Sequence, residues 1–199
     1  DARATGPAAW NDWKAALLLE LYLKLAHLLA ASDLRHPAAG PDAAWMREQV
    51  SRLLPGEEAR LKELPEEYLL SFSPSTVVHH LELRAGLDPR RALMISADCG
   101  EYWSLLVMAR NRAGLLARIC GTLALHSLEV VAAQIFTWPD DTAVDLIHLR
   151  PSPDHGYRDQ DWPALEKDLN LVLANRLALA HRLVHKRRMP LRATRRRNL

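Results

Sequence analysis

The first 86 residues repeat apolar positions with the period of amphipathic helices. Apolar residues recur three and four positions apart, so each group falls on one face of a helix. Asp42 and Ser73 stand immediately before two of these stretches, where a side-chain oxygen accepts a hydrogen bond from a free amide of the first turn. Residues 1–86 are therefore predicted to be all-helical. The predicted helices span residues 10–31, 42–54, 57–64 and 74–86.

The period changes after Asp88-Pro89, where short apolar and β-branched runs follow. Strands are predicted where apolar residues alternate with polar ones or form brief runs bounded by turn residues. Alternate residues of a strand lie on opposite faces, so one face of the last predicted strand carries Ala143, Asp145, Ile147 and Leu149. The predicted strands are 92–97, 102–110, 128–138 and 142–150, and the predicted helices are 113–127 and 161–187.

From residue 102 onward the predicted order is strand, helix, strand, strand, helix. A final strand would complete the βαββαβ, or ferredoxin-like, arrangement. Residues 188–199 have neither the apolar content nor the alternation of a strand. Two explanations stay open: the tail forms a poor edge strand, or the chain stops before the last strand. The predicted fold class is α+β, with an all-helical segment followed by a ferredoxin-like domain.

The net charge of +2 conceals a strong asymmetry along the chain. Residues 1–168 carry 17 Lys and Arg against 24 Asp and Glu, whereas the residues after Asp168 carry nine positive charges and no acid. A nucleic-acid-binding domain usually presents a basic face, so a nucleic-acid partner is not expected. The basic end, residues 185–199, is typical of a solvated helix terminus and linker. Contact of this basic end with an acidic partner surface or with nucleic acid is the alternative.

The composition is that of a globular protein, with 49% hydrophobic and 25% charged residues in a chain of 199. No apolar run reaches the roughly 18 residues of a membrane span, and the first residues lack the apolar segment of a signal peptide. Cys99 and Cys120 are too few for a disulfide framework, so the reducing cytoplasm is the predicted location. The chain starts without Met, which predicts a piece of a longer protein.

The stretch "RNRAGLLARI", residues 110–119, lies where a predicted strand passes into a predicted helix. The first turn of a helix has free N–H groups and the positive end of the helix dipole, which together bind carboxylates or phosphates. Glycine there permits close approach of a ligand, Asn both donates and accepts hydrogen bonds, and Arg adds charge. Tight packing at the turn is the alternative role of the glycine. The candidate ligand-binding residues are Asn111, Arg112, Ala113, Gly114, Leu115 and Leu116.

Residues 102–150 resemble the ACT domain, a small amino-acid-sensing module. Its strand-to-helix signature is Asp-Arg-Pro-Gly-Leu-Leu, and this chain has Asn111 at the first position and Ala113 at the third. Asn in place of Asp removes a carboxylate that would pair with a ligand amine, and Ala in place of Pro loosens the loop. The resemblance implies either amino-acid binding at this loop or a structural copy that pairs with another ACT domain.

Two further stretches extend the resemblance to almost the whole chain. Residues 6–22, with "WNDWK", and residues 64–83, with "YLLSFSP", are together with this module similar to the C-terminal part of bifunctional PII uridylyltransferase/uridylyl-removing enzymes. In that family a nucleotidyltransferase domain and an HD phosphohydrolase domain precede a helical segment and two ACT domains that sense glutamine.

This resemblance implies a regulatory fragment of a cytoplasmic enzyme. Glutamine is then the effector, and the PII signal protein is the partner of the parent enzyme. No cofactor is expected in the fragment, and Mg²⁺ is expected in the catalytic domains outside it. The implied divisions are a helical segment at 1–88, an ACT domain at 89–187 and a basic linker at 188–199 that leads towards a second ACT domain.

The sequence predicts no catalytic or metal-binding motif in the fragment. The Gly-Ser turn of nucleotidyltransferases and the His-Asp dipeptide of HD enzymes are both absent. Adjacent residues of a helix point about 100° apart, so of His79 and His80 one is predicted to be packed and the other solvated. His181 and His185 lie on one predicted helix face without an evident third ligand, so a solvated face is expected. Cys120 is predicted to be a small core residue.

Two other functions stay open. The chain could serve as an ACT-type module of another enzyme, such as an amino-acid biosynthetic enzyme or an alarmone synthetase/hydrolase. The helical half argues against this, because "WNDWK" and "YLLSFSP" have no role there. A pure interaction module is the third interpretation, with helices that bind a partner and a basic tail that binds an acidic surface. Binding that collapses with salt would be typical of it.

Overall fold

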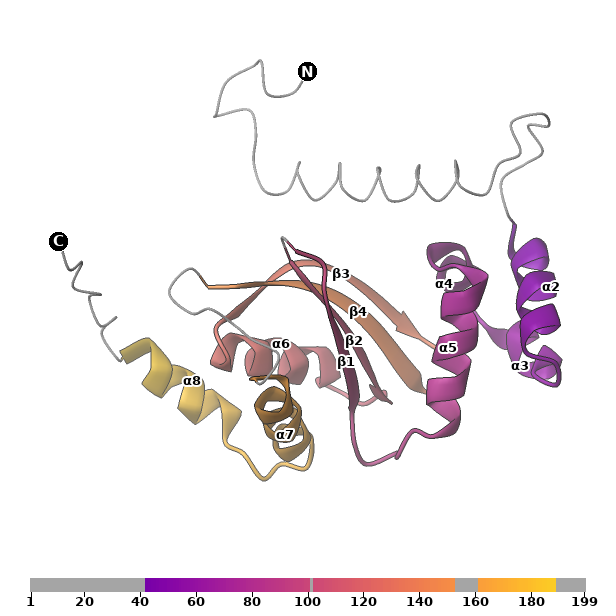
Figure 1. Cartoon of the computed structure of the whole chain (residues 1–199). Coiled ribbons are helices and arrows are strands. Elements are labelled where there is room, and N and C mark those ends of the chain that lie inside the picture. The colour runs from indigo at the N-terminus through magenta and orange to yellow at the C-terminus, as the bar shows by residue number, and fades with distance from the viewer. Residues whose placement is uncertain (1–41, 101, 153–160, 189–199) are drawn as a thin grey trace, which may run out of the picture.

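The computed structural model describes residues 42–100, 102–152 and 161–188 (Figure 1). The predicted helix 10–31 and the tail beyond residue 188 lie outside the described residues. A helical segment precedes a four-stranded sheet with its own helices, which confirms the predicted α+β class. No described helix is long and apolar enough to cross a membrane. The elements are α2 (Ala43–Leu53), α3 (Glu58–Glu63), α4 (Glu66–Ser71), α5 (Pro74–Ala85), β1 (Leu93–Asp98), β2 (Trp103–Arg110), α6 (Leu115–Leu125), β3 (Leu128–Thr137), β4 (Thr142–Pro151), α7 (Trp162–Leu173) and α8 (Leu179–Arg188).

Both predicted helix caps are confirmed. Oδ1 of Asp42 accepts from the N–H of Trp45 at 2.7 Å, and Oγ of Ser73 accepts from the N–H of Thr76 at 3.2 Å. Pro74 holds the first position of α5, where an N–H would have no partner within the helix. The sequence pattern does not predict α4, because its six residues make fewer than two turns and show no clear period.

The sheet is antiparallel and has the strand order β1-β2-β4-β3. From β2 to α7 the elements follow the ferredoxin-like order, with β2 and β4 in the centre. The edge beside β2, which the last strand of such a domain would occupy, is held by β1, from the pair Leu93–Met108 to the pair Asp98–Trp103. The predicted hairpin is confirmed, and the described sheet consists of these four strands.

The single helix predicted at 161–187 is wrong, because the structure has two helices there. Helix α7 ends at Leu173 and α8 begins at Leu179. Between them Asn175 has a φ of 55°, a left-handed conformation in which asparagine is enriched and which a helix interior does not contain. Leu177 is buried in the connection, so apolar residues continue through the break and the period does not reveal it.

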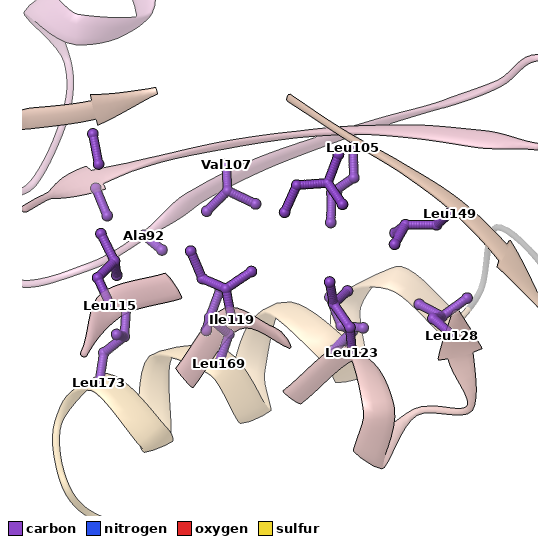
Figure 2. Packing of buried hydrophobic residues seen from close by; sticks show 14 of the residues in the cluster. Ala92, Leu105, Val107, Leu115, Ile119, Leu123, Leu128, Leu149, Leu169 and Leu173 are labelled. Atoms are coloured by element: carbon purple, nitrogen blue, oxygen red, sulfur yellow. The ribbon is translucent and has the colours of Figure 1, made fainter. Parts of the chain in front are cut away.

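Two apolar cores share the sheet, one on each face. The α6–α7 core contains Leu105 and Val107 of β2, which point towards Ile119 of α6 in Figure 2. The α2–α5 core contains Met108 and Val144 from the other face, packed against the four helices of the N-terminal segment. The predicted division of β4 into two faces is confirmed. The helical segment therefore packs directly on the sheet.

Helix α8 packs on the outer side of α6. A Cβ at Gly121 would lie 2.7 Å from Cδ2 of Leu179, so a larger residue would displace that leucine. Nζ of Lys186 donates to the carbonyls of Ala124 and Leu125, each at 2.8 Å. A cation at the C-terminus of a helix stabilises the unpaired carbonyls and the negative end of the dipole. These contacts attach α8 to the end of α6.

Candidate ligand-binding site

The joint between β2 and α6, residues 111–116, is built on Gly114. This residue is the N-cap of α6 and has a φ of +76°, which residues with a Cβ adopt only at a cost. A Cβ there would meet no atom within 4 Å, so the need for glycine is conformational rather than steric. No side chain caps α6 at this end. The N–H of Leu115 donates to the carbonyl of Arg112 at 3.0 Å, and the N–H groups of Leu116 and Ala117 are left at the positive end of the dipole without an acceptor in the described structure.

Asn111 fixes the joint to the β3–β4 turn. Its backbone N–H donates to the carbonyl of Asp141 at 2.6 Å, and its Nδ2 lies 3.5 Å from Oγ1 of Thr137. The side chain is exposed. Within the described part of the chain its Oδ1 has no partner, which leaves an acceptor at the surface of the joint.

Arg112 is bonded to the C-terminal end of α7. Its Nη1 donates to the carbonyl of Leu173 at 3.2 Å, and Nη1 of Arg118 donates to the carbonyl of Val172 at 2.7 Å. Both guanidinium groups lie at the negative end of the α7 dipole. The expectation that Arg112 supplies charge to a ligand stays a prediction, and a ligand would compete with α7 for it.

The three remaining residues of the joint differ in exposure. Ala113 is exposed, and Leu116 is 43% exposed on the surface of α6. Leu115 is buried in the α6–α7 core, where it holds the first turn of the helix on the sheet. The structure therefore brings Asn111, Gly114 and Leu116 to the surface together.

The sequence placed Asp145 on one strand face with Ala143, Ile147 and Leu149, but it did not give Asp145 as a candidate site residue. It is 2% exposed on β4 and lies on the same face as Ala143 and Ile147 of the α6–α7 core. Its Oδ1 is enclosed and has no hydrogen-bond partner in the described structure. Burial raises the pKa of this carboxyl to about 6. The available signal was a carboxylate on a strand face whose other members are apolar.

Cys120 lies near Asp145 but is exposed, so its predicted place in the core is wrong. The buried stripe of α6 runs through Leu115, Ile119 and Leu123, and Cys120 lies one residue beyond it, about 100° around the helix. Partial burial raises the pKa of its thiol, and the Asp145 carboxyl adds to this rise. The Cys120 thiol on α6 and the Asp145 carboxyl on β4 are therefore close enough to interact electrostatically.

The α2–α5 core contains a second buried ionisable residue, His80. Its Nδ1 lies 2.8 Å from the hydroxyl of Tyr68, and the ring of Phe72 lies 5.0 Å away, edge to face. Burial lowers the pKa of His80 to about 4, with a smaller contribution from His79. His79 is exposed, so the prediction of one packed and one solvated histidine is confirmed. The bonded pair of Tyr68 and His80 is a structural element of this core.

The described residues contain no group of three or more His, Cys, Asp or Glu side chains placed to hold a metal ion. His181 and His185 are both exposed on α8, as the sequence predicts. Two surface hollows of about 130 and 320 Å³ have no residue of the joint, 111–116, in their lining. The first lies between α3 and Trp138, and the second runs along α7. The candidate site therefore rests on the exposed groups of the joint.

No known family model matches the chain. It is similar to curated proteins named bifunctional uridylyltransferase/uridylyl-removing enzyme. The relative from Rhodospirillum rubrum is 29% identical over 209 residues and covers 96% of this chain. The relative from Azospirillum brasilense is 30% identical over 200 residues, again 96% of this chain, and the one from Caulobacter vibrioides (strain NA1000 / CB15N) is 30% identical over 163 residues, or 75%. The chain spans about a fifth of these relatives, namely 21%, 21% and 17% of their lengths.

Proposed function

The chain corresponds to a fragment of the bifunctional uridylyltransferase/uridylyl-removing enzymes, as the resemblance predicted, and we propose that it senses glutamine to control uridylylation of the PII nitrogen signal protein. In this proposal the chain is regulatory. Catalysis, together with Mg²⁺, belongs to nucleotidyltransferase and HD domains of a cytoplasmic parent enzyme. PII is a partner of that parent.

The joint is the observation that supports the proposal best. On a ferredoxin-like sheet, β2 ends at Arg110, and Gly114 in a left-handed conformation is the N-cap of α6. Exposed Asn111 stands beside it. Free amides at the positive end of a helix dipole favour a carboxylate or an amide oxygen, and an asparagine side chain complements a carboxamide. These are the groups that glutamine carries.

The α2–α5 core offers a route from the joint to the rest of the parent. Strands β2 and β4 contact α6 on one face and the N-terminal helices on the other, through Met108 and Val144. A ligand shifts a distant site only if it binds one conformation better than another. In the proposed mechanism, glutamine at the joint changes how α6 sits on the sheet, and the helices of the α2–α5 core transmit the change.

Pairing with another ACT domain is part of the proposal. Strand β3 is an edge strand, and Val130 and Ile135 on it are 44% and 43% exposed. An unpaired strand edge with apolar side chains is a surface on which a second strand can add. We expect this edge to contact a second ACT domain or a second copy of the chain.

Calorimetric titration of the chain with L-glutamine, and with L-glutamate as the comparison ligand, tests the proposal. Saturable binding that favours glutamine is expected. Asn111→Ala should weaken it, because the exposed amide of the joint is lost. The matched control is Gln49→Ala, which removes an amide from α2 and should leave binding unchanged.

Failure of both amino acids to bind the folded chain would contradict glutamine sensing by this module. Salt-sensitive binding to an acidic surface, without amino-acid binding, would favour the interaction module instead. Gly114→Val is a poorer test than Asn111→Ala, because a branched residue at a φ of +76° strains the backbone whether or not a ligand binds there.

A further inference from the structure

The carboxylate of Asp145 is buried without a partner, and this calls for an explanation. Only 2% of the residue is exposed, and Oδ1 has no hydrogen-bond partner in the described structure. Burying a carboxylate without a donor or a cation is costly, and nearly all buried polar groups in proteins are hydrogen-bonded. A ligand that donates a hydrogen bond to Oδ1 would offset the free-energy cost of burying this carboxylate.

Asp145 lies on the same sheet face as the polar end of the joint. In the register of β3 and β4, Asp145 pairs with Ile135 and Ala143 pairs with Thr137. Thr137 is the residue whose Oγ1 lies 3.5 Å from Nδ2 of Asn111. Two residues along a strand advance about 7 Å, so one small extended molecule can span from Asn111 to Asp145.

Exposed neighbours of Asp145 come from α6 and β3. Cys120 is exposed and lies one turn after Leu116 on α6. Its thiol interacts electrostatically with the Asp145 carboxyl. Leu116 and Ile135 are each 43% exposed. The other side of α6 faces α7, because His126 bonds Asp168 there at 3.1 Å. Ile135, its partner residue on β3, and the thiol of Cys120 are therefore the partly exposed neighbours of the buried carboxylate.

We propose that Asp145 accepts the primary ammonium group of an amino acid whose other end is held at the joint by Asn111. The proposal rests on the proposed function, since it places the ligand at the joint. Glutamine carries its ammonium group and its carboxamide at opposite ends of a short chain, as this assignment requires. Asp145 then supplies the carboxylate that the ACT signature has at its first position and that Asn111 does not provide.

Proton release is a direct consequence of this assignment. With a pKa of about 6, the Asp145 carboxyl is about half protonated at pH 6 in the free chain. A bound ammonium group favours the ionised form and lowers the pKa, so binding releases up to about half a proton. Val107 and Ile135, its neighbours on β2 and β3, are apolar. Cys120 is the titratable group that faces it from α6, and its thiol keeps its proton at this pH.

The test is calorimetric titration of the chain with L-glutamine at pH 6, in two buffers of different ionisation enthalpy. Asp145→Asn keeps the shape and removes the charge, and the loss of an unpaired buried charge does not threaten folding. Glutamine affinity should fall about 10- to 100-fold in this variant, as for a lost charge-assisted hydrogen bond, and proton release should disappear. Glu129→Gln, an exposed carboxylate on β3, is the matched control and should change neither quantity.

A second ligand separates this inference from the proposed function. The analogue of glutamine that lacks the α-amino group should bind the unsubstituted chain and Asp145→Asn equally, because it offers Asp145 no ammonium. If glutamine binds both chains equally and releases no proton, the assignment of Asp145 is overturned and glutamine sensing stands. If the unsubstituted chain binds no glutamine, the proposed function fails and the assignment fails with it.

Discussion

Each of the two cores that share the sheet encloses an ionisable side chain, and the two side chains differ in their partners. His80 in the α2–α5 core lies 2.8 Å from the hydroxyl of Tyr68. Asp145 beside the α6–α7 core has no partner for its Oδ1 among the described residues. A buried polar group with a partner fixes the packing around it, whereas one without a partner is available to a ligand. The pairing of His80 with Tyr68 is a structural feature of the helical side, and the unpaired Oδ1 of Asp145 is what the proposed binding role of the α6 side rests on.

The two groups also respond to pH in opposite directions. Burial raises the pKa of Asp145 to about 6, so the folded state holds this proton more tightly than the unfolded chain does. The free energy of unfolding that depends on Asp145 therefore falls as pH rises from about 4 to 6. Burial lowers the pKa of His80 to about 4. The contribution of neutral His80 to the free energy of unfolding is complete above the unfolded pKa of about 6.5. This contribution is lost as pH falls towards 4.

The largest expected effect is on the helical side of the comparison. Trp138→Ala removes an indole that is 2% exposed and lies 5.3 Å from the ring of Tyr68 in the α2–α5 core. The free energy of unfolding should fall by about 3–5 kcal/mol, as measured by urea unfolding followed by circular dichroism. Trp45→Ala is the control, because Trp45 is 40% exposed and its loss should cost less than about 0.5 kcal/mol. Equal losses for the two variants would show that the helices do not share a core with the sheet.

The next largest effect is a gain in stability on the α6 side. Asp145→Asn removes a buried charge, so the free energy of unfolding at pH 7 should rise by up to about 3 kcal/mol, the cost of raising the pKa from 3.8 to about 6. The gain should vanish near pH 4, where the carboxyl is protonated in both states. Unfolding curves of both chains from pH 4 to 8 measure it. A difference that stays constant with pH would mean that Asp145 is not buried as a charge.

A smaller loss is expected when the partner of His80 is removed. Tyr68→Phe deletes the hydroxyl that lies 2.8 Å from Nδ1 of His80 and leaves the buried ring nitrogen unpaired. This should lower the free energy of unfolding by about 1–2 kcal/mol. Tyr102→Phe is the control, because the hydroxyl of Tyr102 bonds exposed Cys99 outside both cores and its loss should cost less. No loss in Tyr68→Phe would remove the distinction between a paired and an unpaired buried group.

The two faces of the sheet could be predicted from the sequence because alternate residues of a strand lie on opposite faces. Alternation in β4 separates Ile147 from Val144 in the sequence as it does in the structure. The cap residues Asp42 and Ser73 could also be predicted from the sequence, since a cap bonds an amide only three residues further along the chain. The break between α7 and α8 at Asn175 could not be predicted, because buried Leu177 continues the apolar pattern beyond it.

The candidate site was predictable only in part. The residues of the joint are contiguous, so a short sequence motif is enough to indicate Gly114 and Asn111. Asp145 joins them through the register of β3 and β4, which a single sequence does not contain. Cys120 was misplaced because one residue around a helix changes the side chain from core to surface. The place of β1 beside β2 was predictable, by contrast, because the two strands form a local hairpin.

The smallest effect distinguishes the two explanations for the glycine at the joint. Gly114→Ala adds a Cβ that meets no atom within 4 Å, but at a φ of +76°. The loss in the free energy of unfolding should therefore be about 1 kcal/mol, which is the cost of the left-handed conformation alone. Gly86→Ala is the matched control, because Gly86 ends α5 at a φ of −97° and its added Cβ would lie 3.9 Å from the carbonyl of Leu83. The free energies of unfolding of the two variants, measured in urea, decide between the two explanations. An equal change in both would mean that Gly114 is not needed for its conformation, and a loss several times larger would mean that tight packing, rather than an opening for a ligand, explains the glycine.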